Sequence, residues 1–82
     1  MNAYIACLRD TLARLLDEAK ESESAASWLN GQPGQAFELG RVDAFSNSLH
    51  IWKNQLETFG IGSELEDTWA DLNQFLQERG LP

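Results

Sequence analysis

Apolar residues recur every three or four positions through the first quarter of the chain. They are Tyr4, Ile5, Leu8, Leu12, Leu15, Leu16 and Ala19. This spacing places the apolar residues on one face of a helix, and charged residues such as Arg9 and Asp17 fall largely on the other side. Asn2 can cap the N-terminus of this helix through its side-chain oxygen. The pattern therefore predicts a helix over residues 3–22.

The next stretch, residues 23–34, is the least regular part of the chain. It is rich in Ser, Asn, Gly, Gln and Pro, which is typical of a connection between helices. Its apolar members, from Ala25 to Leu29, leave room for one short helical turn that would close the end of the core. Asn30 and Gly31 would then end that turn, because both tolerate a left-handed backbone.

A second helix is predicted over residues 35–59, and it carries two rows of apolar residues. The main row is Val42, Phe45, Leu49, Trp52, Leu56 and Phe59, and the second is Phe37, Ala44 and Ile51, with Ser48 and Gln55 at its edge. Because two adjacent rows can pack against two neighbours, we expect this helix to be central. Gly40 interrupts it, and would mark either a close approach by another backbone or a later start of the helix.

Glycines indicate where the last two helices end. Gly60 suits the left-handed position that follows a helix, with Ile61 folding back on Leu56, and Gly80 and Leu81 repeat the arrangement. Between them the pattern predicts a third helix over residues 64–79. Its apolar face is Leu65, Trp69, Leu72 and Leu76.

A capping box is predicted at the start of the third helix, formed by Ser63 and Glu66. The link before this helix is so short that helices two and three should be antiparallel neighbours. The predicted fold is a single all-α domain over residues 1–82, a small three-helix bundle with a long central second helix.

The charge balance narrows the classes of partner. The chain has 13 acidic and 6 basic residues and a formal net charge of −7. Nucleic acids and anionic lipid headgroups are bound mainly through Lys and Arg, so neither is expected as a partner. Such a charge attracts basic proteins, although it also serves solubility alone.

The sequence also favours a cytoplasmic location. Arg9 and Asp10 interrupt the first apolar stretch, no stretch approaches the length of a membrane span, and the single Cys7 fits a reducing compartment.

The residue inventory argues against catalysis and against a bound cofactor or metal. Cys7 and His50 are the only cysteine and histidine, and nothing in the pattern brings them together. A structural zinc site usually needs four such ligands. We expect Cys7 at the edge of the core and His50 on a solvated helix face. The chain also lacks a glycine-rich phosphate loop that ends in Lys-Ser/Thr.

Two groups of residues are candidates for binding a partner. The first is an acidic row on the third helix formed by Glu64, Asp67, Asp71 and Glu78, with Phe75 beside it. This row is either a solvated face or a docking surface for a basic protein, and Phe75 would either contact that partner or pack on the first helix. The second group is Glu38 and Arg41. In a structural role the two would pair with each other, or Arg41 would cap backbone carbonyls of the first connection. Alternatively, they form a partner-facing hot spot.

These observations predict a protein-binding module without enzymatic activity. In size, acidity and lack of catalytic residues the chain is similar to small inhibitor, immunity-type and accessory proteins of bacteria and phages. The expected partner is a protein with a basic or amphipathic surface. The alternatives are a dimeric structural module held by the apolar surplus of the second helix, and an inhibitor that imitates DNA. The latter needs double rows of acidic residues, whereas this chain offers one.

Overall fold

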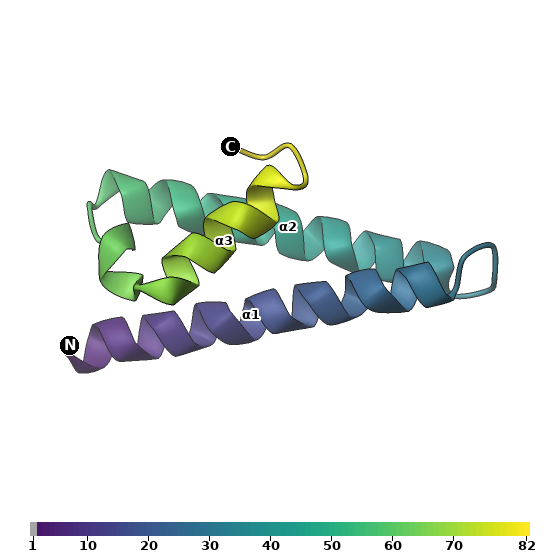
Figure 1. The fold of residues 1–82 in the computed structure, drawn as a ribbon, viewed down its shortest axis with the longest axis horizontal. Coiled ribbons are helices and arrows are strands. Elements are labelled where there is room, and N and C mark those ends of the chain that lie inside the picture. The colour runs from purple at the N-terminus through teal and green to yellow at the C-terminus, as the bar shows by residue number, and fades with distance from the viewer. Residues whose placement is uncertain (1) are drawn as a thin grey trace.

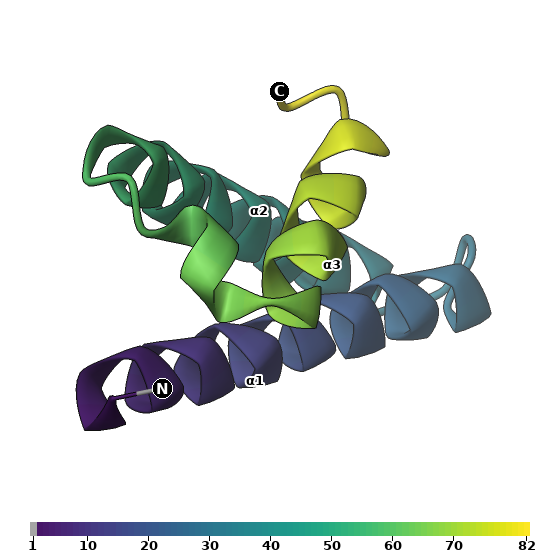
Figure 2. The ribbon, with the colours of Figure 1, turned by 60° about the vertical axis from the view of Figure 1, so that its left-hand side comes forward.

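The computed structural model describes residues 2–82 and shows an all-helical chain. Its elements follow in the order α1 (Ala3–Trp28), α2 (Gln35–Thr58), the short 3-10 helix η1 (Gly62–Leu65) and α3 (Asp67–Gln77). Helices α1 and α2 form a long antiparallel hairpin, and α3 lies obliquely across it (Figure 1). The second view shows α3 rising from α1 towards α2 (Figure 2). The molecule is elongated, with extents of 44 × 23 × 16 Å.

Helix α1 is longer than the sequence pattern predicts, and this corrects the expected connection over residues 23–34. Helical backbone continues to Trp28, and the side chains of Ser22 and Ala26 extend the buried stripe. These small residues let α2 approach closely, so tertiary packing outweighs the low helix propensity of the serines. The short helical turn expected in this connection is absent, and the turn that exists, η1, lies between α2 and α3.

The α1–α2 connection is held by Gln35, the first residue of α2. Its side-chain amide donates a hydrogen bond to the carbonyl of Ala26 at 3.2 Å, and its side-chain oxygen accepts one from the Gly31 amide at 3.1 Å. Gly31 has a φ of 73°, the left-handed conformation expected at this position. A single polar side chain therefore ties the end of α1 to the start of α2.

Three predicted helix ends are confirmed. The Asn2 side chain accepts a hydrogen bond from the Ile5 amide at 2.9 Å and so caps α1. At the end of α2, Gly60 has a φ of 69° and the Ile61 amide donates to the Leu56 carbonyl at 3.0 Å. The same pattern follows α3, where Gly80 has a φ of 72° and the Leu81 amide donates to the Leu76 carbonyl at 2.9 Å.

The predicted capping box is wrong. Ser63 lies inside η1, and α3 begins only at Asp67. Glu66 separates the two elements with a φ of 55°, and its side chain makes no capping hydrogen bond. The 3-10 turn takes the place of a regular helix start because it buries Leu65 completely.

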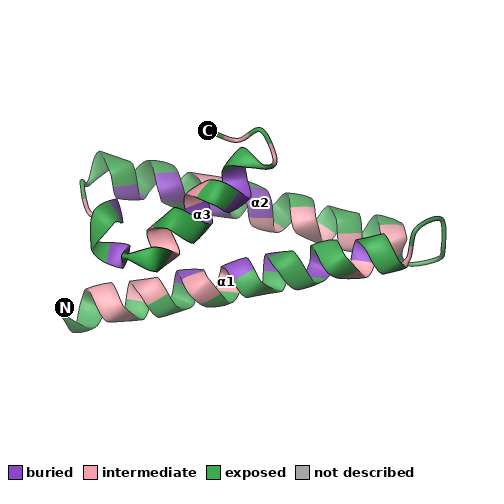
Figure 3. Ribbon diagram, viewed as in Figure 1, coloured by how far each residue is buried: buried purple, intermediate pink, exposed green. Residues whose placement is uncertain are grey.

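The core lies in the groove of the hairpin, under η1 and α3. Its buried residues are Leu12, Leu16, Ala19, Leu49, Leu56, Leu65, Leu72, Phe75 and Leu76. Helices α1 and α2 make the most extensive contact with each other. The expectation that α2 packs through both apolar rows is wrong, because Phe37, Ala44 and Ile51 of the second row are exposed. Figure 3 shows the buried stretches of α2 where η1 and α3 lie on the hairpin, and exposed stretches along its length. Helix α3 instead covers the side of α2 that already faces α1.

Candidate functional site

The predicted acidic row forms an exposed surface on η1 and α3, which we call the acidic face. It consists of Glu64, Asp67, Asp71 and Glu78, all of which are exposed. Asp67 is in the first turn of α3, and the next turn places Asp71 on the same side. The buried side of α3, with Leu72 and Leu76, holds this row outward.

The acidic face has no basic partner within residues 2–82. Four of the six basic side chains in this part of the chain form ion pairs, namely Arg9, Arg41, Lys53 and Arg79. Their carboxylate partners are Asp10, Glu18, Glu23, Glu38, Glu57 and Glu66. None of these is a residue of the acidic face. The negative charge of the chain is therefore least compensated on η1, on α3 and at a few positions of the hairpin.

A small hollow of about 110 Å³ lies beside the acidic face, lined by Lys20, Asp71, Gln74, Phe75 and Glu78. It is smaller than the cavities that hold drug-sized ligands. Lys20 approaches from α1 but forms no ion pair with these carboxylates. A macromolecular partner would therefore lie over the acidic face and would not enter the hollow.

Phe75 belongs to the core and is not part of the exposed acidic face. Its side chain is 2% exposed and lies in the cluster that includes Leu16 and Ala19 of α1. Of the two roles considered for Phe75, packing on the first helix is the one observed. Its inclusion among the partner-binding residues is therefore corrected, because a buried ring offers no area to a partner.

Glu38 and Arg41 have a structural role and lie apart from the acidic face. The Arg41 guanidinium is 3.6 Å from the Glu38 carboxylate, as predicted for an i, i+3 pair, and 3.5 Å from Glu18 of α1. It also lies 5.8 Å from the centre of the Phe45 ring. These contacts tie the first half of α2 to α1. The Glu38 side chain is only 16% exposed, which leaves little of it for a partner.

The structure shows a second exposed surface, which sequence reasoning had assigned to packing within the bundle. We call this surface the apolar row; it consists of Phe37, Ala44, Ile51 and Trp52 of α2 and the C-cap residue Phe59. The large residues of the row are 68% (Phe37), 63% (Ile51), 41% (Trp52) and 72% (Phe59) exposed. The spacing of the row is visible in the sequence, but whether a neighbour covers it depends on where α3 lies.

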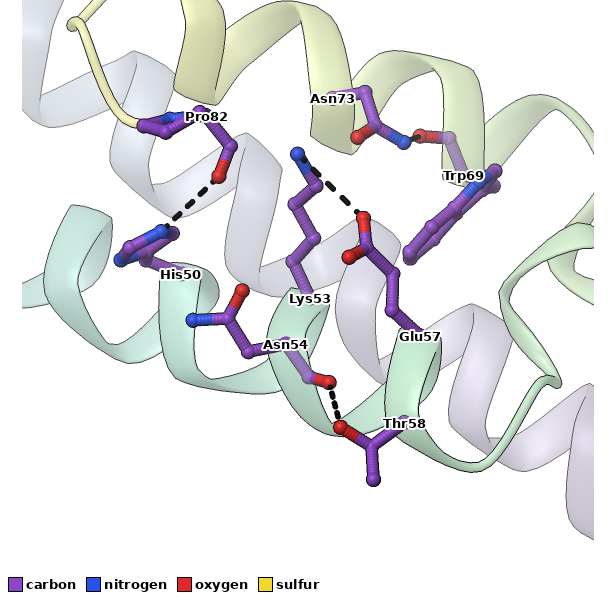
Figure 4. Close-up of polar contacts among 8 residues, drawn as sticks. All are labelled: His50, Lys53, Asn54, Glu57, Thr58, Trp69, Asn73 and Pro82. Carbon is purple, nitrogen blue, oxygen red and sulfur yellow. Dashed lines mark hydrogen bonds and ion pairs between the residues drawn. The ribbon is translucent and has the colours of Figure 1, made fainter.

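Lys53 is a buried basic residue that the sequence pattern did not single out. Its side chain is 8% exposed and runs beneath α3, near Trp69 and Asn73 (Figure 4). The ammonium nitrogen is 3.7 Å from a carboxylate oxygen of Glu57, whose side chain is 54% exposed. The long apolar stem of a lysine can pack against such neighbours, as the stems of buried lysines commonly do.

The two residues considered for nucleophilic chemistry lie in unremarkable surroundings. Cys7 is exposed, whereas we had expected it at the edge of the core. His50 is half-buried, and its Nε2 atom lies 3.1 Å from the carbonyl oxygen of Pro82, so it is less solvated than expected (Figure 4). Within residues 2–82, neither side chain hydrogen-bonds to a group that would activate it.

Within residues 2–82, no three His, Cys, Asp or Glu side chains are grouped so that they could hold a metal ion. The helices of this part of the chain are too short or too polar to cross a membrane. A scan against protein-family models found no match, and searches of curated proteins and of solved structures found none either. The two exposed surfaces, the acidic face and the apolar row, are the candidates for binding a partner.

Proposed function

We propose that this chain is a non-enzymatic protein-binding module, an inhibitor or accessory protein that docks its acidic face against a basic surface of another protein. The observation that carries the proposal is the acidic face itself. Four exposed carboxylates lie on η1, on α3 and at its C-cap, and no ion pair within residues 2–82 neutralises them. Within residues 2–82, no three metal-ligating side chains are grouped, and the sequence has no glycine-rich phosphate loop that ends in Lys-Ser/Thr.

The physical advantage of such a surface is in the rate and selectivity of association. Exposed charges of one sign steer a partner of opposite charge and accelerate its encounter. Since the carboxylates are already supported by a packed helix, docking requires little rearrangement of the backbone. The acidic residues of α3 form one row, so the surface supports docking to a basic protein better than it supports imitation of a DNA duplex, which presents two rows of phosphates.

The test uses a pair of matched charge reversals. The partner is first captured from a lysate of the native host, and its affinity is then measured by calorimetry. In the acidic face, Asp67→Lys is combined with Asp71→Lys. The control combines Asp17→Lys with Glu21→Lys, because these α1 residues are also exposed, unpaired and four positions apart.

Both variants change the net charge equally, so a difference between them reports the location of the charge. We expect the α3 variant to bind at least about tenfold more weakly than the α1 variant, with a shallower dependence on salt. Circular dichroism of both variants checks that the helices are intact. Equal affinities for the two variants would show that the acidic face is not the docking surface.

A further inference from the structure

The apolar row leaves a large hydrophobic area without a partner in the monomer. Phe37, Ile51, Trp52 and Phe59 point away from the core and are between 41% and 72% exposed. Single exposed apolar residues are ordinary, but four large ones along one side of a helix indicate an interaction surface. No acidic residue or lysine interrupts the row, although the chain as a whole carries a charge of −7.

Four of the five members of the row are arranged symmetrically about one residue, whereas the fifth, Ile51, has no counterpart in the row. Phe37 and Phe59 are each eleven positions from Ser48, and Ala44 and Trp52 are each four positions from it. If two copies of α2 lie antiparallel with a two-fold axis at Ser48, each Phe37 meets Phe59 of the other copy. Each Trp52 then meets Ala44 of the other copy, so that a large side chain packs against a small one. Isologous interfaces require this self-complementarity.

We propose that the chain pairs with a second copy of itself through the apolar row, with the two α2 helices antiparallel. The exposed area is sufficient. The four large side chains expose on the order of 500 Å² in one copy, given their exposed fractions and the usual size of such side chains. A symmetric pair that covers these side chains completely removes about 1,000 Å² from water before the small residues are counted, which is the minimum expected of a specific interface.

Charge also favours a second copy over other occupants. Two copies with a net charge of −7 repel each other across most of their surface, and the apolar row is where they can meet without opposing carboxylates. The nearest charged group is Arg41, which Glu18 and Glu38 already neutralise. An anionic membrane would need flanking basic residues, and α2 offers only Arg41 and the buried Lys53. Because α3 packs on another side of α2, pairing leaves the acidic face free.

The first test measures mass in solution by light scattering and sedimentation at micromolar and higher concentrations. We expect a dimer for the unmodified chain and a monomer for Ala44→Glu, with the dissociation constant raised at least about a hundredfold by the buried charge. The matched control is Ala36→Glu, because Ala36 is also exposed on α2 but lies outside the row. It should remain dimeric. A monomeric unmodified chain, or an Ala44→Glu variant that still dimerises, overturns the proposal.

The second test locates the axis by disulfide cross-linking. In a Cys7→Ser background, Ser48→Cys places a thiol at the proposed two-fold axis, where the two Cα atoms would be close enough for a disulfide. Oxidation should yield a cross-linked dimer, whereas Ser24→Cys on the exposed side of α1 should cross-link far less. Equal cross-linking at both positions would contradict the geometry.

This inference is independent of the proposed function, and the variants separate the two. If Ala44→Glu is monomeric but still binds the captured partner, both ideas stand. If the charge reversals on α3 leave partner binding unchanged while Ala44→Glu abolishes dimers, the proposed function fails and the inference survives.

Discussion

The guanidinium of Arg79 lies over the aromatic ring of Phe75, 3.4 Å from the ring centre. The same side chain donates a hydrogen bond to the Phe75 carbonyl at 2.7 Å and forms an ion pair with Glu23 of α1. Burial lowers the pKa of the Arg79 guanidinium from its ordinary value, although arginine remains charged under all ordinary conditions. Arg79 thus fastens the end of α3 to α1 and covers the core at Phe75.

Replacing Arg79 should therefore destabilise the fold more than removing its ionic partner. We expect Arg79→Ala to lower the free energy of unfolding by about 1–3 kcal/mol, because packing on Phe75 and the carbonyl hydrogen bond are both lost. Glu23→Ala should cost less than about 1 kcal/mol, since the Glu23 side chain is 54% exposed. Urea unfolding followed by circular dichroism measures both. Equal losses would mean that the ion pair, and not the packing, fastens α3.

Gly62 gives a second prediction, because it lies against the ring of Trp69. A Cβ atom at position 62 would be 2.6 Å from the indole ring, far inside van der Waals contact. Gly62→Ala should lower the free energy of unfolding by about 1–3 kcal/mol and change the fluorescence of Trp69. The control is Gly40→Ala, because nothing lies within 4 Å of a Cβ atom added at position 40. This variant is measured at high dilution. It should stabilise α2 by up to about 1 kcal/mol. A neutral Gly62→Ala would show that the indole moves aside freely.

Glu66 gives a third prediction through its backbone. Its φ of 55° is unfavourable for a residue with a side chain, and glycine adopts such a conformation easily. Glu66→Gly should raise the thermal midpoint, whereas Glu66→Ala should not. Both variants lose the ion pair with Arg9, which is long at 3.9 Å. The difference between their thermal midpoints therefore reports the backbone strain at position 66. If alanine stabilises as much as glycine, the strain is not the cause.

The sequence predicts those parts of the fold that depend on nearby residues. Asn2, Gly60 and Gly80 act within one turn of their own helix, and all three helix ends were predicted correctly. The length of α1 was underestimated because the predicted helix ends at Ser22, whereas the buried stripe continues to Ala26 and the helix to Trp28. Intrinsic propensity gives no indication of such burial.

The candidate site could be predicted only in part, for the same reason. Helical spacing was enough to place Asp67 and Asp71 on one exposed side of α3. The burial of Phe75 and the exposure of Ile51 depend on the crossing of α3 over the hairpin, which is a relationship between elements. Because α3 crosses the groove instead of lying along the second row of α2, Phe75 belongs to the core and Ile51 stays at the surface.

Lys53 provides the last prediction, because its burial is not matched by strong pairing. The residue is 7% exposed, and its ionic partner, Glu57, lies 3.7 Å away with its own side chain 54% exposed. Removing a charge from water costs free energy, and a single long contact with a solvated carboxylate recovers little of it. Lys53→Met keeps the apolar stem and removes the charge. It leaves no buried unpaired group, because Glu57 remains hydrated.

We therefore expect Lys53→Met to raise the free energy of unfolding by about 1 kcal/mol, measured by urea denaturation at low ionic strength. The matched control is Lys20→Met, an exposed lysine without an ion pair, which should change stability by less than about 0.5 kcal/mol. A destabilised Lys53→Met variant would show that the ammonium contributes more than its packing suggests. In that case Lys53 and Glu57 together, and not the apolar stem alone, would support the contact between α2 and α3.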